Sequence, residues 1–273
     1  MNTTQKIIKY LALAFAIFLI VTIFSGILTG IYIMSNILGL KKEDTETIRE
    51  ISTLELEEIN DYAYLDIDIK YSNLKIKIGE KFEVQTSNNN IEVNQKDNKL
   101  KILEKQNNWF WGNSNEEELI VYIPENIEFE KANIQTGAGI VNIEEIKAKK
   151  IKLNLGAGET IINNIISDNV DINGGVGKFT IENGIMHDLD FDLGVGETTI
   201  NAKITGNNKI DTGIGRLKLN IDGNIEDYKL KVEKGIGDIK LNGKQVSNNT
   251  TIGDGENVID IDGGIGEIVI NFK

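Results

Sequence analysis

The alternation of apolar and polar residues divides the chain into an apolar start and a long remainder with a two-residue period. No residue between Tyr10 and Leu40 is charged, and Leu11–Ile33 is mostly aliphatic or aromatic. From Tyr64 onward, apolar residues recur at every second position, in short runs that Asn, Gly, Asp and Ser separate. Such runs are typical of half-buried strands. The pattern therefore predicts one apolar helix followed by an all-β body.

The apolar start is long enough to be a membrane anchor. About 20 successive apolar residues cross the hydrocarbon core of a bilayer, whereas a signal peptide has a shorter apolar region followed by a small-residue cleavage site. We therefore expect an uncleaved transmembrane helix over residues 10–34, with cleavage as the alternative. Two lysines flank this helix on each side, so the positive-inside rule gives no orientation.

The expected layout of the chain follows from this anchor. Residues 1–9 are too few to fold, whereas the rest of the chain is strongly acidic. We therefore expect a cytoplasmic tail at 1–9 and an extracytoplasmic C-terminal domain, as in a single-pass protein of the cell membrane. Residues 35–62 are expected to form a juxtamembrane stalk. Residues 63–124 are expected to form a meander or cap of short strands, which Pro124 closes.

A Gly-x-Gly triplet with an apolar middle residue recurs seven times between residues 125 and 273. The first five triplets begin 19 residues apart, and the last two follow at intervals of 22 and 29 residues. A period near 20 residues is the signature of a solenoid, in which each repeat stacks on the next. We predict an all-β repeat β-solenoid over 125–273, a single-stranded β-helix-like stack with a glycine corner in each coil. The predicted corner glycines are Gly137, Gly139, Gly156, Gly158, Gly175, Gly177, Gly194, Gly196, Gly213, Gly215, Gly235, Gly237, Gly264 and Gly266.

Three columns of residues are apolar throughout when the repeats are aligned on their first glycine. They lie three residues before that glycine, inside the triplet, and six residues after it. We expect all three columns to stack inside the solenoid. Because strand side chains alternate between faces, this spacing requires a bulge or corner at the triplet, which glycine allows. The column inside the triplet comprises Ala138, Ala157, Val176, Val195, Ile214, Ile236 and Ile265.

The repeats and the strands before them resemble a known family. The segments IVYIPENIEFEKANIQTGAGIVNIEEI, LNLGAGETIINNI and FDLGVGETTINAKI are similar to the bacterial putative-adhesin family of β-strand repeats, which is related to the toast-rack domains of cell-envelope proteins. The resemblance covers roughly residues 60–273. It implies the same repeat fold, a membrane anchor and an envelope setting, and it implies no catalytic residues.

Composition excludes several classes of partner and cofactor. The formal net charge is −13, which disfavours binding to the phosphates of nucleic acids. The chain has no cysteine, so neither disulfides nor thiolate metal sites are expected. The stretch GGVGK is similar to a phosphate-binding loop, but Phe179 stands where that loop needs Ser or Thr. We expect no cofactor.

A calcium site is one alternative that the sequence leaves open. In the calcium-binding nonapeptide repeat an Asp is the ligand, but Phe179 and Ile268 occupy the equivalent positions here. A column of acids could still hold a hard cation between coils, and so could the loop IGDGEN at residues 252–257. Stacked acids on a wet face are more often simply solvated. The acidic column comprises Asp192, Asp211, Glu233 and Asp262.

An enzyme of envelope carbohydrates, built on a β-helix, is the alternative in a different functional class. Such an enzyme needs a base beside acidic metal ligands in a groove. Arg216 follows a corner next to Asp211, where a surface ion pair is the expected role. His187 lies in a loop with no partner evident in the sequence. We therefore expect no catalytic residue and no metal site.

An aromatic cluster outside the repeats is the remaining candidate for binding. Trp109, Phe110 and Trp111 lie in an expected hairpin loop. Aromatic side chains can stack on sugars or anchor a partner. Alternatively, these three cap the open end of the solenoid, because an open end must be covered to prevent edge pairing.

The sequence therefore predicts a membrane-anchored, non-catalytic binding or scaffold module of the cell envelope. Its expected partners are the membrane, through one N-terminal helix, and an envelope protein or a surface polymer. An adhesin-like role and a role as a regulatory partner in envelope stress both stay open. Self-association is a further expectation, because the terminal strand GEIVINFK would pair with another copy if it were an unpaired edge.

Overall fold

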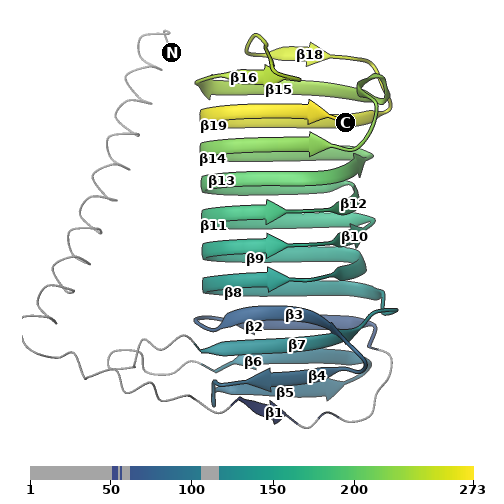
Figure 1. Ribbon diagram of the computed structural model, residues 1–273, viewed down its shortest axis with the longest axis vertical. Coiled ribbons are helices and arrows are strands. Elements are labelled where there is room, and N and C mark those ends of the chain that lie inside the picture. Colours follow the sequence, from purple (N-terminus) through teal and green to yellow (C-terminus); the bar gives the residue numbers. More distant parts are fainter. Residues whose placement is uncertain (1–50, 55, 57–61, 106–116) are drawn as a thin grey trace, which may run out of the picture. The chain divides into compact units, whose positions relative to one another are not determined.

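The structure, a computed structural model, describes residues 51–54, 56, 62–105 and 117–273 (Figure 1). The expected cytoplasmic tail, the transmembrane helix over residues 10–34 and most of the expected stalk lie outside the described residues. Trp109, Phe110 and Trp111 also lie outside them. Among the residues that are described, no helix is long and apolar enough to cross a membrane. The anchor therefore stays a prediction.

The body is a stack of parallel coils, each built from a long strand that bends at its Gly-x-Gly triplet. Neighbouring strands pair in a register that places triplet on triplet, such as Gly158 on Gly139 and Gly177 on Gly158. This confirms the all-β repeat fold. The strands are β8 (Phe129–Ile143), β9 (Ile146–Ile162), β11 (Asn169–Ile181), β13 (Leu189–Thr205) and β14 (Asn207–Ile221). Short strands β10 (Ile165–Ser167) and β12 (Gly184–His187) form the return side of the coils.

The coils are not stacked in sequence order. Strand β19 (Asn257–Phe272) pairs with β14 on one side, and with β15 (Tyr228–Ile236) and β16 (Ile239–Leu241) on the other. The chain therefore leaves one position empty after β14 and returns to fill it with β19 (Figure 1). GEIVINFK is not an unpaired edge, because both sides of this strand are paired within the chain, so the condition for self-association through it is not met. The last two, irregular repeat intervals mark this crossover.

The end of the stack beyond β15 is partly covered. Strand β18 (Thr250–Ile252) pairs antiparallel with β15, and β17 (Lys244–Gln245) pairs antiparallel with β16. A short 3-10 helix, η2 (Ile225–Asp227), precedes β15, and the Asn224 side chain accepts a hydrogen bond from the Glu226 amide at its start. Antiparallel segments of this kind limit edge pairing with other chains.

The other end of the stack includes strands that the sequence analysis placed in a meander. Strands β2 (Tyr64–Ile69) and β3 (Asn73–Gly79) pair in parallel with the two halves of β8. They form a coil in which Lys70, Tyr71 and Ser72 replace the triplet. Strands β6 (Lys99–Glu104) and β7 (Glu118–Pro124) form the next coil. Strands β1 (Ser52–Leu54), β4 (Glu83–Thr86) and β5 (Ile91–Lys96) pair antiparallel with their neighbours.

The core lies between the two sides of the coils. The column three residues before the first glycine is fully buried, from Ile134 to Val232, and the column six residues after it is buried except at Leu241, which is partly buried. Those two expectations are confirmed. Phe179 and Phe191 pack against each other with ring centroids 5.2 Å apart, so aromatic rings fill the middle of the stack.

Candidate binding surface

The residue inside each triplet points toward solvent, so the expectation that this column lies inside the solenoid was wrong. The exposed fraction is 38% at Val195 and 65% at Ile236, and Ile214 is half-buried. The inward position is instead the residue just before the first glycine, where Leu193 is buried. The change of face therefore takes place at the first glycine, before the residue inside the triplet. Two-residue periodicity could not reveal this one-residue difference.

These outward side chains form a continuous apolar line along the corner, which we call the corner stripe. Pairing of the strands places each member beside the next, at about 4.8 Å per coil. Tyr71 belongs to it, because the register of β2 and β3 with β8 places Tyr71 beside Ala138. In spatial order the corner stripe comprises Tyr71, Ala138, Ala157, Val176, Val195, Ile214, Ile265 and Ile236.

Two polar columns run beside the corner stripe. The leading flank, two residues before the first glycine, changes from amides to acids along the stack. In spatial order it comprises Gln135, Asn154, Asn173, Asp192, Asp211, Asp262 and Glu233. The trailing flank, one residue after the second glycine, mixes both charges. It comprises Ile140, Glu159, Lys178, Glu197, Arg216, Glu267 and Asp238.

Ion pairs between coils neutralise much of the trailing flank. Lys178 Nζ lies 2.9 Å from Glu159 Oε1, and Arg216 lies 2.6 Å from Glu267. Lys240 and Arg216 hold the pKa of Glu267 below its usual value through hydrogen bonds to the carboxylate. Arg216 thus forms a surface ion pair, as expected, but with Glu267 of the next coil in space rather than with Asp211.

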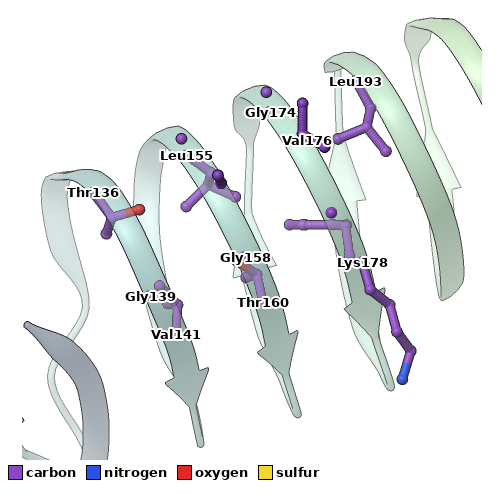
Figure 2. A pocket seen from close by; sticks show the side chains of 15 residues that line it. Thr136, Gly139, Val141, Leu155, Gly158, Thr160, Gly174, Val176, Lys178 and Leu193 are labelled. Atoms are coloured by element: carbon purple, nitrogen blue, oxygen red, sulfur yellow. The ribbon is translucent and has the colours of Figure 1, made fainter. Parts of the chain in front are cut away.

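The hollows next to the corner are too small or too open to enclose a ligand. A cavity of about 20 Å³ lies beneath the corner, where Thr136, Leu155, Gly174 and Leu193 follow one another in successive coils (Figure 2). That volume accommodates about one water molecule. A shallow, open depression follows the leading flank over the side chains of Asn154 and Asn173. The surface is therefore suited to an extended contact.

The acidic column has no geometry for a metal ion. Its members lie side by side in the order Asp192, Asp211, Asp262 and Glu233, and Lys209 pairs with Asp211. Over the described ranges no three His, Asp or Glu side chains are arranged to hold a metal ion. In the loop at residues 252–257, the Asn257 side chain bonds the Gly206 amide and the Asp227 carbonyl, which is a structural role.

His187 is half-exposed and makes two contacts at the return side of the coils. Its Nδ1 lies 3.0 Å from the Thr205 hydroxyl, and its Nε2 lies 3.6 Å from the Asp188 carboxylate. This arrangement holds the loop rather than activating a nucleophile, because the Thr205 hydroxyl also bonds the Met186 carbonyl.

The described strands on either side of the aromatic residues end and begin at the corner. Strand β6 ends at Glu104, in line with Ile69, and β7 resumes at Glu118, opposite Asn73. Trp109, Phe110 and Trp111 lie between these two positions in the sequence and outside the described residues. Its expected binding or capping role stays a prediction.

Glu104 is a structural site residue that sequence reasoning missed. It is only 9% exposed, and its carboxylate accepts hydrogen bonds from the amides of Lys70 at 2.5 Å and Tyr71 at 2.9 Å. Asn88 Nδ2 and the Ser72 hydroxyl donate to it at 2.7 and 3.2 Å. Successive amides at a bend form an anion-binding nest, so Glu104 stabilises the one described corner that lacks glycine. In the sequence, Glu104 follows Leu100 and Ile102 at the next inward-facing position of an alternating run, which was the available sign that its side chain is buried.

Comparisons with known proteins identify one matching family and several similar solved structures. The profile of a family described as Toastrack DUF4097 matches residues 58–252. A "putative cell adhesion protein" from Clostridium sporogenes is similar at 18% identity over 82% of this chain and 100% of that chain, with a TM-score of 0.36. A "putative adhesin" from Bacteroides fragilis is similar at 14% identity over 81% of this chain and 97% of that chain, with a TM-score of 0.33. A "putative lipid binding protein" from Parabacteroides distasonis is similar at 14% identity over 82% of this chain and 96% of that chain, with a TM-score of 0.29. No curated protein matches the chain.

Proposed function

This chain belongs to the Toastrack DUF4097 family, and we propose that it is a non-catalytic binding module of the cell envelope whose contact surface is the corner stripe. The observation that carries this proposal is the repeated exposure of aliphatic side chains, with Val176 56% and Ile236 65% exposed. The corner itself requires only the flanking glycines. A contiguous exposed apolar patch with polar margins is typical of an interaction surface.

Burial of the corner stripe would supply the binding energy. Each square ångström of apolar surface removed from water contributes about 25 cal/mol. The flanks contribute less, because their exposed ion pairs, such as Lys178 with Glu159, already satisfy each other. Polar flanks instead set specificity and register. A rigid stack with an apolar centre and polar margins therefore favours a binding role over catalysis.

The envelope setting is part of the same proposal. Residues 10–34 anchor the chain in the membrane, and the coils lie outside the cytoplasm, where an envelope protein or a surface polymer is the partner. Similar solved structures include proteins named as adhesins. An adhesin-like role and a regulatory role in the envelope both use a surface of this kind.

Site-specific photocrosslinking in cells that produce the full chain tests the proposal. We expect a photoreactive amino acid at Val176 to give discrete crosslinked products, because Val176 lies at the middle of the corner stripe. The same photoreactive amino acid in place of Lys218 should give no crosslinked product, because Lys218 is an exposed residue of β14 that lies away from the corner. Both side chains point outward, so neither replacement should disturb folding. Products from Lys218 and none from Val176 would contradict the proposed contact surface.

A further inference from the structure

We propose that the corner stripe binds the corner stripe of a second copy of this chain, with the two stacks antiparallel and related by a two-fold axis. This inference rests on the proposed function, because it names the partner of the same surface. The axis passes between the coils of Val176 and Val195. A coil at a given distance from the axis in one copy then faces the coil at the same distance on the opposite side of the axis in the second copy's own order.

The sizes of the apolar side chains are complementary under this symmetry. Residues in the corner stripe grow from Ala through Val to Ile along the first six triplet coils in space. Reversal of one copy places Val176 opposite Val195, Ala157 opposite Ile214, and Ala138 opposite Ile265. Each small side chain therefore meets a large one, and the combined volume stays nearly constant. Close packing across an interface requires this kind of matching.

The leading flank is complementary in the same register. Antiparallel copies bring leading flank against leading flank, so Asn173 faces Asp192, and Asn154 faces Asp211. Gln135 faces Asp262 in the same way. An amide donates hydrogen bonds that a carboxylate accepts, and each of these three acids is thus opposite a donor. A parallel pair in level register would instead place Asp192 opposite Glu197, where like charges repel.

The trailing flank also matches. Lys178 faces Glu197 of the second copy, and Arg216 faces Glu159. Glu197 lies beside Lys178 and Arg216 of its own chain, which are paired with Glu159 and Glu267, so a lysine of the second copy gives Glu197 a direct partner. At the outer end, Ile140 meets Glu267, which Arg216 and Lys240 already neutralise.

The ends of the stripe extend the contact with one mismatch. Tyr71 faces Ile236, and both are among the most exposed large apolar side chains. Asp68 faces Glu233, which is the like-charge pair in this arrangement, but Lys70 Nζ lies 2.5 Å from Asp68 and offsets the repulsion. The full contact is about 34 Å long, from the rise of about 4.8 Å per coil. It is narrow compared with the roughly 800 Å² per partner of a standard interface, so we expect a reversible dimer.

Cysteine pairing tests both the partner and the register, because the chain has no cysteine of its own. Full-length Ala157→Cys and Ile214→Cys, carrying different tags, are mixed in detergent solution and mildly oxidised. We expect a mixed disulfide between them. Each variant alone should give no dimer, since its two copies would lie three coils apart, about 14 Å, beyond the reach of about 7 Å for a disulfide. Ala157→Cys mixed with Lys218→Cys is the matched control.

The other outcomes separate this inference from the function on which it rests. Self-crosslinking of Ala157→Cys would overturn the antiparallel register. If the mixed disulfide does not form while photocrosslinks at Val176 reach a different protein or a polymer, the second copy is the wrong partner and the binding surface stands. If both experiments give nothing, the corner stripe is not a contact surface and both proposals fail.

Discussion

Replacement of Gly196 by alanine is expected to destabilise the protein by at least about 3 kcal/mol. The backbone of Gly196 has φ +147°, which side chains rarely adopt, and a Cβ there would lie 1.7 Å from the carbonyl oxygen of Gly177. Both glycines lie between neighbouring coils, so neither backbone can retreat without breaking the strand pairing. Chemical denaturation of the purified full chain measures the change in the free energy of unfolding.

Gly243→Ala is the matched control for this prediction. Gly243 also has a positive φ, +76°, but a Cβ added there would have no atom within 4 Å. The control therefore carries only the cost of a side chain at positive φ, about 1 to 2 kcal/mol. It does not carry the collision with a neighbouring coil. Equal losses in the two variants would show that contact between stacked corners does not set the requirement for glycine.

The second large effect is expected at Glu104. Glu104→Ala removes the acceptor for the amides of Lys70 and Tyr71 and for the side chain of Asn88. Unsatisfied buried donors each cost about 1 to 3 kcal/mol, so we expect a loss of about 3 kcal/mol or more. Thermal and chemical unfolding measure it, and amide hydrogen exchange should show faster exchange at the corner between β2 and β3.

An exposed glutamate provides the comparison for Glu104. Glu92 pairs with Lys105 at 2.8 Å, with 47% and 67% of the two side chains exposed. Exposed pairs of this kind contribute little, and Glu92→Ala should change stability by less than about 0.5 kcal/mol. A loss at Glu104 no larger than that at Glu92 would mean that the corner without glycine does not depend on its buried carboxylate.

The repeat fold was predictable from sequence because its core columns are periodic. Ile134 and its equivalents lie three residues before a glycine in every repeat, and they are buried as expected. The face of the residue inside the triplet was not predictable in the same way. Glycine allows the change of face at either of two neighbouring positions, and apolar character alone does not distinguish a core residue from an exposed contact residue. Val176 therefore looked like core.

Two further features could not be obtained from the repeat alignment. The coil formed by β2 and β3 has Lys70, Tyr71 and Ser72 at its corner, so a search for glycine triplets does not find it. Its stability depends on Glu104, which lies 34 residues from Lys70 in the chain. The position of β19 is likewise a property of pairing in space. An alignment orders the repeats along the chain, so it cannot show that a later strand inserts between two earlier strands in space.

The place of β19 between β14 and β15 sets an order of events during biosynthesis. Domains begin to fold as the chain emerges from its N-terminal side, so the coils from β8 to β14, which are stacked in chain order, can assemble progressively, each coil templating the next. Beyond β14 this simple growth stops, because the neighbour of β14 is made only after β15, β16, β17 and β18. A nascent chain that has reached β15 must therefore keep two strands apart, or in a provisional pairing, until Asn257–Phe272 arrives. The crossover thus makes completion of the stack a late step, and a chain interrupted before it exposes the unpaired edges of β14 and β15, which are templates for pairing with other chains.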